Sequence, residues 1–215
     1  MTDNNSGEVI ALQAGGDRQR DVHLPAFHAY WESMRKMGDV PRRADIDPRG
    51  IEPLLENAMI IEKVAPGLAR MRIAGTALSD LLGMEVRGMP LSALIDPQDR
   101  DKLADMLADL FERPATLDLS LKAETGLGRP AMNARLLLLP LRSDLGDISR
   151  ALGCFVTNGM IGRTPRRFRI QNGEVTPVIL PAEGRLARGF EDAPAPFTAE
   201  IPAHRGERPY LRVVK

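Results

Sequence analysis

The sequence has little that would mark a secreted, membrane or metal-binding protein: it contains one cysteine, Cys154, and three histidines among 215 residues. A single cysteine cannot form a disulfide within the chain or supply a cysteine metal cluster. No apolar run approaches the roughly 18 residues that a membrane-spanning helix needs, and residues 1–16 are polar, unlike a signal peptide. Lysine and arginine number 29, as do aspartate and glutamate, so no net charge attracts nucleic acid or an anionic membrane. We therefore expect a soluble cytoplasmic protein that binds neither.

Sequence signatures of common catalytic sites are also missing. The phosphate-binding loop, the nucleophile elbow, the zinc-binding His-Glu-x-x-His helix and paired Cys-x-x-Cys motifs do not occur. Carboxylates such as Glu52, Glu56 and Glu62 are scattered, and no pattern brings them together as an acid–base pair. We expect no catalytic residue, no metal site and no enzyme activity.

What the sequence does contain is a pattern of three neighbouring β-strands in residues 116–157. Leu117, Leu119 and Leu121 alternate with polar residues, as expected of a strand with one buried face. The connections between the strands are short, which favours an antiparallel meander, because parallel pairing needs a crossover of a dozen or more residues. The predicted strands are 117–123, 131–141 and 150–157.

The segment before the meander predicts a hairpin and then helices. Residues 58–64 and 68–73 read as two strands joined by a tight turn. Short helices are predicted near 76–82 and 91–95, followed by a longer one over 97–111. The element order predicts an α+β fold, with a five-stranded antiparallel sheet and helices on one face.

The ends of that longer helix and of the first short helix carry recognisable caps. Asp96 is placed to cap the longer helix, and Pro97 fits the first helical position, where no backbone donor is needed. Thr76 is the expected N-cap of the first short helix, and Gly83 its stop.

An amphipathic helix is predicted at 24–37, where apolar residues recur at spacings of three and four. One interpretation places this stripe on the sheet of its own domain. The other adds a second copy of the chain, because the helix holds the single tryptophan of the sequence. The residues assigned to that dimer interface are Leu24, Phe27, Tyr30, Trp31 and Met34.

Both ends of the chain differ in composition from the middle. Residues 1–21 are rich in Asn, Gln, Gly and Asp, and are expected to be disordered. We place the main domain at 22–158 and a C-terminal extension at 159–215. Within the extension, Asn172-Gly173 predicts a hairpin over 166–180, and the Pro-rich residues beyond 181 predict a mobile tail.

The strand-to-helix junction carries a resemblance to a known family. Arg72-Ile73-Ala74-Gly75-Thr76, followed by Leu78, Leu82-Gly83, Glu85 and Gly88, resembles the junction of PAS domains, especially the bacterial single-PAS family common in α-proteobacteria. The resemblance covers about 24–157 and includes the element order. Glycines at 75 and 83 permit backbone conformations that bulkier residues avoid, so that short helices can turn over the sheet.

The resemblance implies a sensory and interaction module with a ligand pocket between the sheet and its helices. A stripe of leucine and methionine is equally what a packed core requires, so a filled core stays an alternative. Mapped by strand phase, the pocket would be lined by Met71, Ile73, Leu78, Leu82, Met106, Leu110, Leu119, Leu121, Met132 and Leu136.

The resemblance raises the question of a haem or flavin cofactor, and we expect neither. His23, His28 and His204 lie outside the predicted sheet and longer helix, which leaves no candidate for a haem ligand. A photoactive flavin module would need a reactive cysteine in an Asn-Cys-Arg context before the longer helix, whereas Cys154 lies on the last strand of the meander. No cofactor is required, and any ligand would be small and apolar.

A basic run at 163–169 follows the sheet. Arginine side chains suit phosphate and carboxylate groups, so the run is a candidate anion site. Its spacing weakly resembles the Arg-x-x-x-Arg element of cyclic-di-GMP-binding PilZ domains, although the second element of that motif is absent. A solvated linker is the other interpretation. The candidate anion-binding residues are Arg163, Arg166, Arg167 and Arg169.

Taken together, these patterns predict a stand-alone cytoplasmic PAS-type sensory and signal-transduction module that acts through ligand-modulated protein–protein interaction. Its partners would be a second copy, in a homodimer, and a separate signalling protein. Three alternatives stay open: a ligand-free docking protein, a cyclic-dinucleotide or anion binder using 163–169, and a small enzyme with ionisable groups converging in the cavity. The sequence specifies neither the ligand nor the partner.

Overall fold

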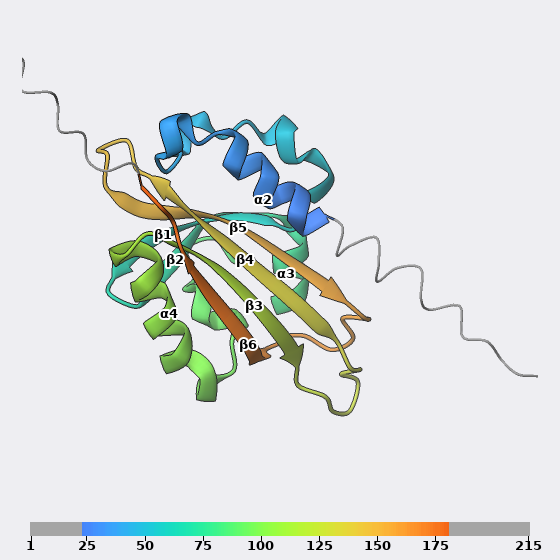
Figure 1. The fold of residues 1–215 in the computed structure, drawn as a ribbon. Helices are drawn as coiled ribbons and strands as arrows, with labels where there is room; N and C mark the ends of the chain where they lie inside the picture. The colour runs from blue at the N-terminus through green and yellow to red at the C-terminus, as the bar shows by residue number, and fades with distance from the viewer. Residues whose placement is uncertain (1–22, 181–215) are drawn as a thin grey trace, which may run out of the picture. The chain divides into compact units, whose positions relative to one another are not determined.

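The computed structural model describes residues 23–180, which form an antiparallel sheet of six strands in the order β2-β1-β5-β4-β3-β6 (Figure 1). The hairpin and the meander are both confirmed, because β1 pairs with β2 and the strands β3, β4 and β5 lie side by side in antiparallel pairs. The strands are β1 (Ala58–Ala65), β2 (Leu68–Ala74), β3 (Ala115–Ala123), β4 (Asn133–Arg142), β5 (Ile148–Asn158) and β6 (Phe168–Pro177).

Helices come before the hairpin and between β2 and β3, so the predicted α+β class is confirmed. No helix among residues 23–180 is both long enough and apolar enough to span a membrane. The α-helices are α2 (His23–Ser33), α3 (Thr76–Leu82) and α4 (Arg100–Glu112). The 3-10 helices are η1 (Lys36–Gly38), η2 (Arg43–Asp45), η3 (Pro48–Leu54), η4 (Leu91–Leu94) and η5 (Pro97–Asp99).

The inner face of the sheet is the one that α3, η4 and α4 cover. The Asp96 carboxylate accepts a hydrogen bond from the backbone N–H of Gln98 at 2.9 Å, and Pro97 follows it directly, as the cap pattern predicts. The chain then turns through η5 into α4, whose buried stripe includes Leu103, Leu107 and Leu110. Together with the inward side chains of the strands, these residues form the inner core.

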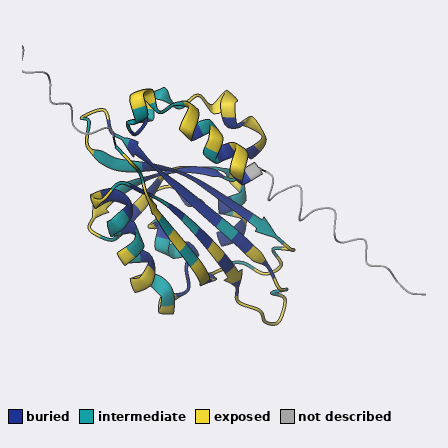
Figure 2. Cartoon of the chain, in the orientation of Figure 1, coloured by how far each residue is buried: buried dark blue, intermediate teal, exposed yellow. Residues whose placement is uncertain are grey.

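The outer face of the sheet carries a second core, the outer core, beneath α2 and η3 (Figure 1). Phe27 and Trp31 of α2 are buried against Leu139 and Leu152 of the sheet. Figure 2 shows that the strands beneath α2 are largely buried while its outward side is exposed. The helix therefore lies on its own domain's sheet, and η3 packs beside it. We call residues 23–57, which contain α2 and η3, the cover.

Strand β6 corrects two predictions: the sheet has six strands, and residues 166–180 do not form a hairpin. Gln171, Asn172 and Gly173 lie inside β6, which pairs with β3 over its whole length, with a bulge near Gln171. The glycine serves packing here, since a Cβ at Gly173 would lie 2.7 Å from Cε of Met106 and 2.8 Å from Cδ2 of Leu119.

Some element ends also differ from the prediction. Helix α2 ends at Ser33 rather than near 37, and Met37 itself adopts a left-handed conformation with φ of 53°. The N-cap of α3 is Gly75 rather than Thr76, while Gly83 ends α3 in the left-handed conformation with φ of 72°, as predicted. The predictions of disorder at 1–21 and of a mobile tail beyond 181 lie outside the described residues.

Candidate functional site

The predicted ligand pocket between sheet and helices is occupied by packed side chains. Nine of its ten residues belong to the inner core or pack against it, and Met71, Leu110 and Leu136 are fully buried there. Their side chains come from β2, β4 and α4, so the strand phases used for the prediction were correct for these positions. This arrangement is a filled apolar core. The nine residues are Met71, Leu78, Leu82, Met106, Leu110, Leu119, Leu121, Met132 and Leu136.

Ile73 is the exception, since it lies on the outer face and is 46% exposed. Met71 and Ile73 are two positions apart and would share a face in a regular strand. The pairing register shifts between them, however: Ile61 lies opposite Met71, whereas the preceding Ile60 lies opposite Ile73. This β-bulge inserts one extra residue, Arg72, and turns the Ile73 side chain to the other face. The assignment of Ile73 to the inner pocket is therefore wrong.

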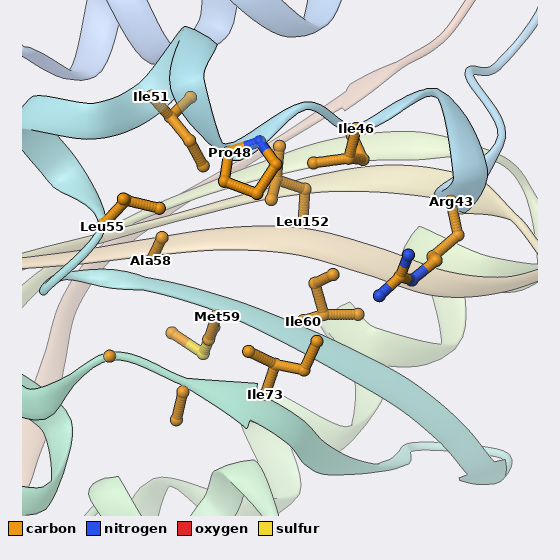
Figure 3. A pocket seen from close by; sticks show the side chains of 12 residues that line it. Arg43, Ile46, Pro48, Ile51, Leu55, Ala58, Met59, Ile60, Ile73 and Leu152 are labelled. Carbon is orange, nitrogen blue, oxygen red and sulfur yellow. The ribbon is translucent and has the colours of Figure 1, made fainter.

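A pocket of about 250 Å³ opens on the outer face, between the cover and the β1–β2 side of the sheet (Figure 3). One wall comes from the segment that contains η2 and η3, and the other from β1, β2 and β5. We call this cavity the outer pocket. Its lining residues are Arg43, Ile46, Pro48, Ile51, Leu55, Ala58, Met59, Ile60, Ile73, Ala74, Gly75 and Leu152.

Hydrogen bonds from α2 fix the elements that form this wall. The Tyr30 hydroxyl donates to the carbonyl oxygen of Asp47 and accepts from the N–H of Asp47, both at 2.8 Å. The Asp47 carboxylate accepts from the N–H of Arg49 at 3.0 Å and so caps η3. The indole Nε1 of Trp31 donates to the carbonyl oxygen of Pro140 in β4 at 2.9 Å. Two aromatic residues of α2 thus join this helix to the start of η3 and to the sheet.

Arg43 places a positive charge at the outer pocket. Its side chain is half-buried and extends toward Ile60 in Figure 3. Among residues 23–180, no carboxylate forms an ion pair with the Arg43 guanidinium. The nearest acidic residues in the sequence have other partners, since Asp45 pairs with Lys36 at 3.0 Å and Asp39 pairs with Arg142 at 2.8 Å.

The outer pocket was not predicted, because strand phase and family resemblance placed the ligand pocket on the inner face. A signal was present in the strands. Leu137, Leu139 and Leu141 occupy the second parity of β4 and all belong to the outer core, so β4 is buried on both faces. Continuous apolar runs of this kind are typical of strands that are covered on both sides.

The residues assigned to a dimer interface are mostly engaged within the chain. Leu24, Phe27 and Trp31 are 3%, 1% and 0% exposed in the outer core, so they cannot contact a second copy while the cover stays packed. Tyr30 and Met34 are half-buried at the edge of the same core. This corrects the location of the predicted interface, and it leaves self-association itself as a prediction.

Two of the four candidate anion-binding arginines serve the fold. The buried guanidinium of Arg166 donates to the carbonyl oxygens of Ile161, Glu124 and Pro130, and burial lowers its pKa. Arg169 donates to the Asp99 carboxylate at 2.7 Å and to the Gln98 side chain at 2.8 Å. Arg163 and Arg167 are exposed. The four side chains therefore do not form one cationic surface.

A pair of carboxyl groups lies where β3 ends beside the start of β6. The interaction between the side chains of Asp96 and Glu124 raises the pKa of Glu124 and lowers that of Asp96. Arg129 lies 3.9 Å from Glu124, and Arg169 lies 4.0 Å from Asp96. The pair is thus surrounded by compensating charge, and neither residue lines the outer pocket.

Cys154 does not have the properties of a reactive thiol. It lies on β5 in the outer core, and burial raises its pKa to about 12. A flavin photoproduct would need an accessible cysteine, and this residue does not fit that role. No group of three or more metal-ligating side chains occurs within residues 23–180.

The strand order β2-β1-β5-β4-β3, with short helices between β2 and β3, defines a small α+β domain with a central antiparallel sheet. The family model of the PAS domain matches residues 20–156, and the chain belongs to this family. No curated protein matches the chain.

Solved structures resemble the chain at low identity. The light-state structure of the blue-light photoreceptor Aureochrome1 LOV is 16% identical with a TM-score of 0.35, over 52% of this chain and 88% of that one. The dark structure of the same photoreceptor is 16% identical with a TM-score of 0.36, over 51% and 80%. An RNA-binding Light-Oxygen-Voltage receptor is 17% identical with a TM-score of 0.36, over 55% of this chain and 36% of that one.

Proposed function

We propose that this PAS domain is a sensory module whose responsive element is the cover, defined as residues 23–57 with α2 and η3. In this proposal the output is protein–protein interaction, with a separate signalling protein and with a second copy of the chain. The supporting observation is the contrast between the two faces of the sheet. The inner core is filled, whereas the outer core contains an open pocket with the cover as one wall.

The proposed mechanism is a shift between two packings of the cover. A ligand or partner that fits one packing better than the other changes their populations by its difference in affinity. Because Ile51 and Leu55 of the cover face Ile60 and Ile73 of the sheet across the outer pocket, filling the pocket alters the contact between cover and sheet. Movement of the cover would then change the surface that a partner meets.

Hydrogen–deuterium exchange of the full chain tests whether the cover opens on its own. We expect the amides of α2 and η3 to exchange faster than those of β4 and β5, since local opening costs less free energy than global unfolding. The variant Tyr30→Phe removes the hydroxyl that holds Asp47, and it should speed exchange in η3 while leaving α4 unchanged.

A matched control is Leu107→Ala in the inner core, which lowers global stability without touching the cover. It should speed exchange in all elements together. If the cover exchanged at the global rate in the wild type and in Tyr30→Phe, the proposed independent movement would be wrong.

We further propose that the chain is cytoplasmic, has no catalytic activity of its own and associates with itself. The described carboxylates that lie close together are compensated by arginines, as at Asp96 and Glu124, which supports a binding role. Sedimentation velocity of the wild type over a wide concentration range tests self-association, and a monomer at all concentrations would contradict it. A Trp31→Glu variant is unsuitable, because this residue is fully buried and a charge there would unfold the cover.

A further inference from the structure

We propose that the outer pocket binds a small amphipathic carboxylate, with its apolar tail between η3 and the β1–β2 hairpin and its carboxylate on Arg43. This site lies on the outer face of the sheet, whereas the ligand pocket predicted from the sequence lies on the inner face. Binding itself stands on the geometry of the pocket, and only its role as a signal rests on the function proposed above.

The apolar part of the ligand is indicated by the walls of the pocket. Side chains of Ile46, Ile51 and Leu55 face Ile60 and Ile73, with Leu152 behind them (Figure 3). Leu55 is 40% exposed and Ile73 is 46% exposed, so the pocket leaves apolar surface in contact with water. Covering this surface with a hydrocarbon tail is favourable by the hydrophobic effect.

The charge of the ligand is indicated by Arg43. A guanidinium group forms strong paired hydrogen bonds with a carboxylate, and this one has no carboxylate partner among the described residues. The acidic groups near it in the sequence are already used: Asp45 by Lys36, and Asp47 by the N–H of Arg49. One uncompensated cation beside an apolar wall matches a ligand with one negative charge.

The size of the pocket selects a small molecule. Sites for drug-sized ligands are typically on the order of 300–1,000 Å³. The outer pocket, with about 250 Å³, lies just below that range. It therefore suits a medium-chain acid.

Isothermal titration of the full chain with sodium octanoate tests the proposal, with octanol and octylammonium as comparison ligands. We expect octanoate to bind at least tenfold more tightly than octanol, because a hydrogen bond to a charged group is typically worth more than one factor of ten. Octylammonium should bind more weakly than either. Equal affinity for octanoate and octylammonium would overturn the proposal, as would the absence of octanoate binding at millimolar concentration.

Variants of the pocket locate the binding. Arg43→Gln should weaken octanoate at least tenfold and leave octanol unchanged, because only the charged contact is lost. The control Arg49→Gln removes an exposed arginine of η3 that does not line the pocket, and it should bind octanoate as the wild type does. Ile73→Asp places a negative charge on the wall and should abolish octanoate binding. Circular dichroism of each variant confirms that it is folded. Unchanged octanoate affinity in Arg43→Gln would overturn the assignment.

Hydrogen–deuterium exchange with and without octanoate separates this proposal from the proposed function. Octanoate bound through Arg43 should slow the exchange of η3 amides in the wild type and not in Arg43→Gln. If octanoate bound through Arg43 but left the exchange of the cover unchanged, the site would stand and the sensory role of the cover would fail. If Arg43→Gln bound octanoate normally, the site would fail while the independent opening of the cover would be unaffected.

Discussion

The indole N–H of Trp31 is hydrogen-bonded to the carbonyl oxygen of Pro140 at 2.9 Å, across 109 positions of sequence. This bond joins the last turn of α2 to β4, one of the central strands of the sheet. Trp31 is fully buried, so its ring contributes both apolar packing and the one polar contact that its N–H needs. Trp31 therefore attaches α2 to the sheet by both packing and a hydrogen bond.

Replacing Trp31 by Phe should lower the free energy of unfolding by about 2 kcal/mol or more. The change removes buried volume and leaves the buried Pro140 carbonyl without its donor. Urea unfolding followed by circular dichroism measures the effect, because the variant has no tryptophan fluorescence. The control Glu32→Gln changes an exposed residue of the same helix, whose ion pair with Arg35 lies at the surface, and should cost about 0.5 kcal/mol or less. Equal losses in the two variants would contradict the role of Trp31.

Neighbouring arginines in the basic run should behave differently on substitution. Arg166→Lys should lower the free energy of unfolding by about 2–4 kcal/mol, because a lysine cannot donate to the carbonyls of Ile161, Glu124 and Pro130 together. Arg167→Lys alters an exposed side chain and should change stability by about 0.5 kcal/mol or less. Chemical unfolding of both variants in parallel gives the comparison. A larger loss for Arg167→Lys would show that the assignment of the structural arginine is wrong.

The thiol of Cys154 should be unreactive in the folded protein. Its pKa of about 12 keeps it protonated at neutral pH, and its position in the outer core blocks reagents. Reaction with Ellman's reagent should be slow in buffer and complete at once in concentrated urea. Tyr30→Phe should speed the reaction in buffer if opening of the cover exposes β5. A thiol that reacts rapidly in the native wild type would contradict the burial of this residue.

The pair between Asp39 and Arg142 should make stability depend on pH on the acid side. Hydrogen bonds from the Arg142 guanidinium, at 2.8 to 3.2 Å, lower the pKa of the Asp39 carboxyl. A carboxyl whose pKa is lower in the folded chain stabilises it above the ordinary value near 4, and this contribution is lost as pH falls through the lowered value. Asp39→Asn should therefore be less stable than the wild type at pH 7, and the difference should shrink at pH 3.

Urea unfolding at several pH values measures this difference. Asp144→Asn serves as a control, because Asp144 is 70% exposed and lies 3.5 Å from Arg150. Its effect should be small at every pH. A gap between the wild type and Asp39→Asn that stayed constant from pH 7 to pH 3 would contradict the role of this ion pair.

Local patterns in the sequence predicted the inner half of the fold well. Asp96 and Pro97 marked the start of the longer helical segment, and the alternation of Leu117, Leu119 and Leu121 gave the inward side of β3. Such signals work because each depends on one hydrogen bond or on the period of one element. The order of these elements along the chain then supported the resemblance to PAS domains, which the family match confirms.

The predictions from sequence are wrong where contacts between residues far apart in the sequence determine the structure. The bulge at Arg72 is set by pairing with β1, and it moved Ile73 to the outer face. Asn172-Gly173 is a turn signal by itself, yet the close approach of Met106 explains the glycine within a strand. The outer pocket depends on where the cover lies against the sheet. The apolar stripe of α2 indicates packing on the sheet but not where along the sheet the helix lies.

The sixth strand places the boundary of the folding unit beyond the boundary of the family match. The match ends at residue 156, whereas β6 hydrogen-bonds to β3 from Ala115 to Ala123, and its Phe168 contacts Phe155 edge to face at 5.1 Å. Truncating the chain after residue 158 would remove β6, which pairs with β3, and with it Phe168, which packs against Phe155. The edge of β3 would then expose unpaired backbone N–H and C=O groups. Exposed strand edges of this kind can pair with other chains and cause aggregation. Strand β6 of the C-terminal extension thus protects the edge of β3 from pairing with other chains.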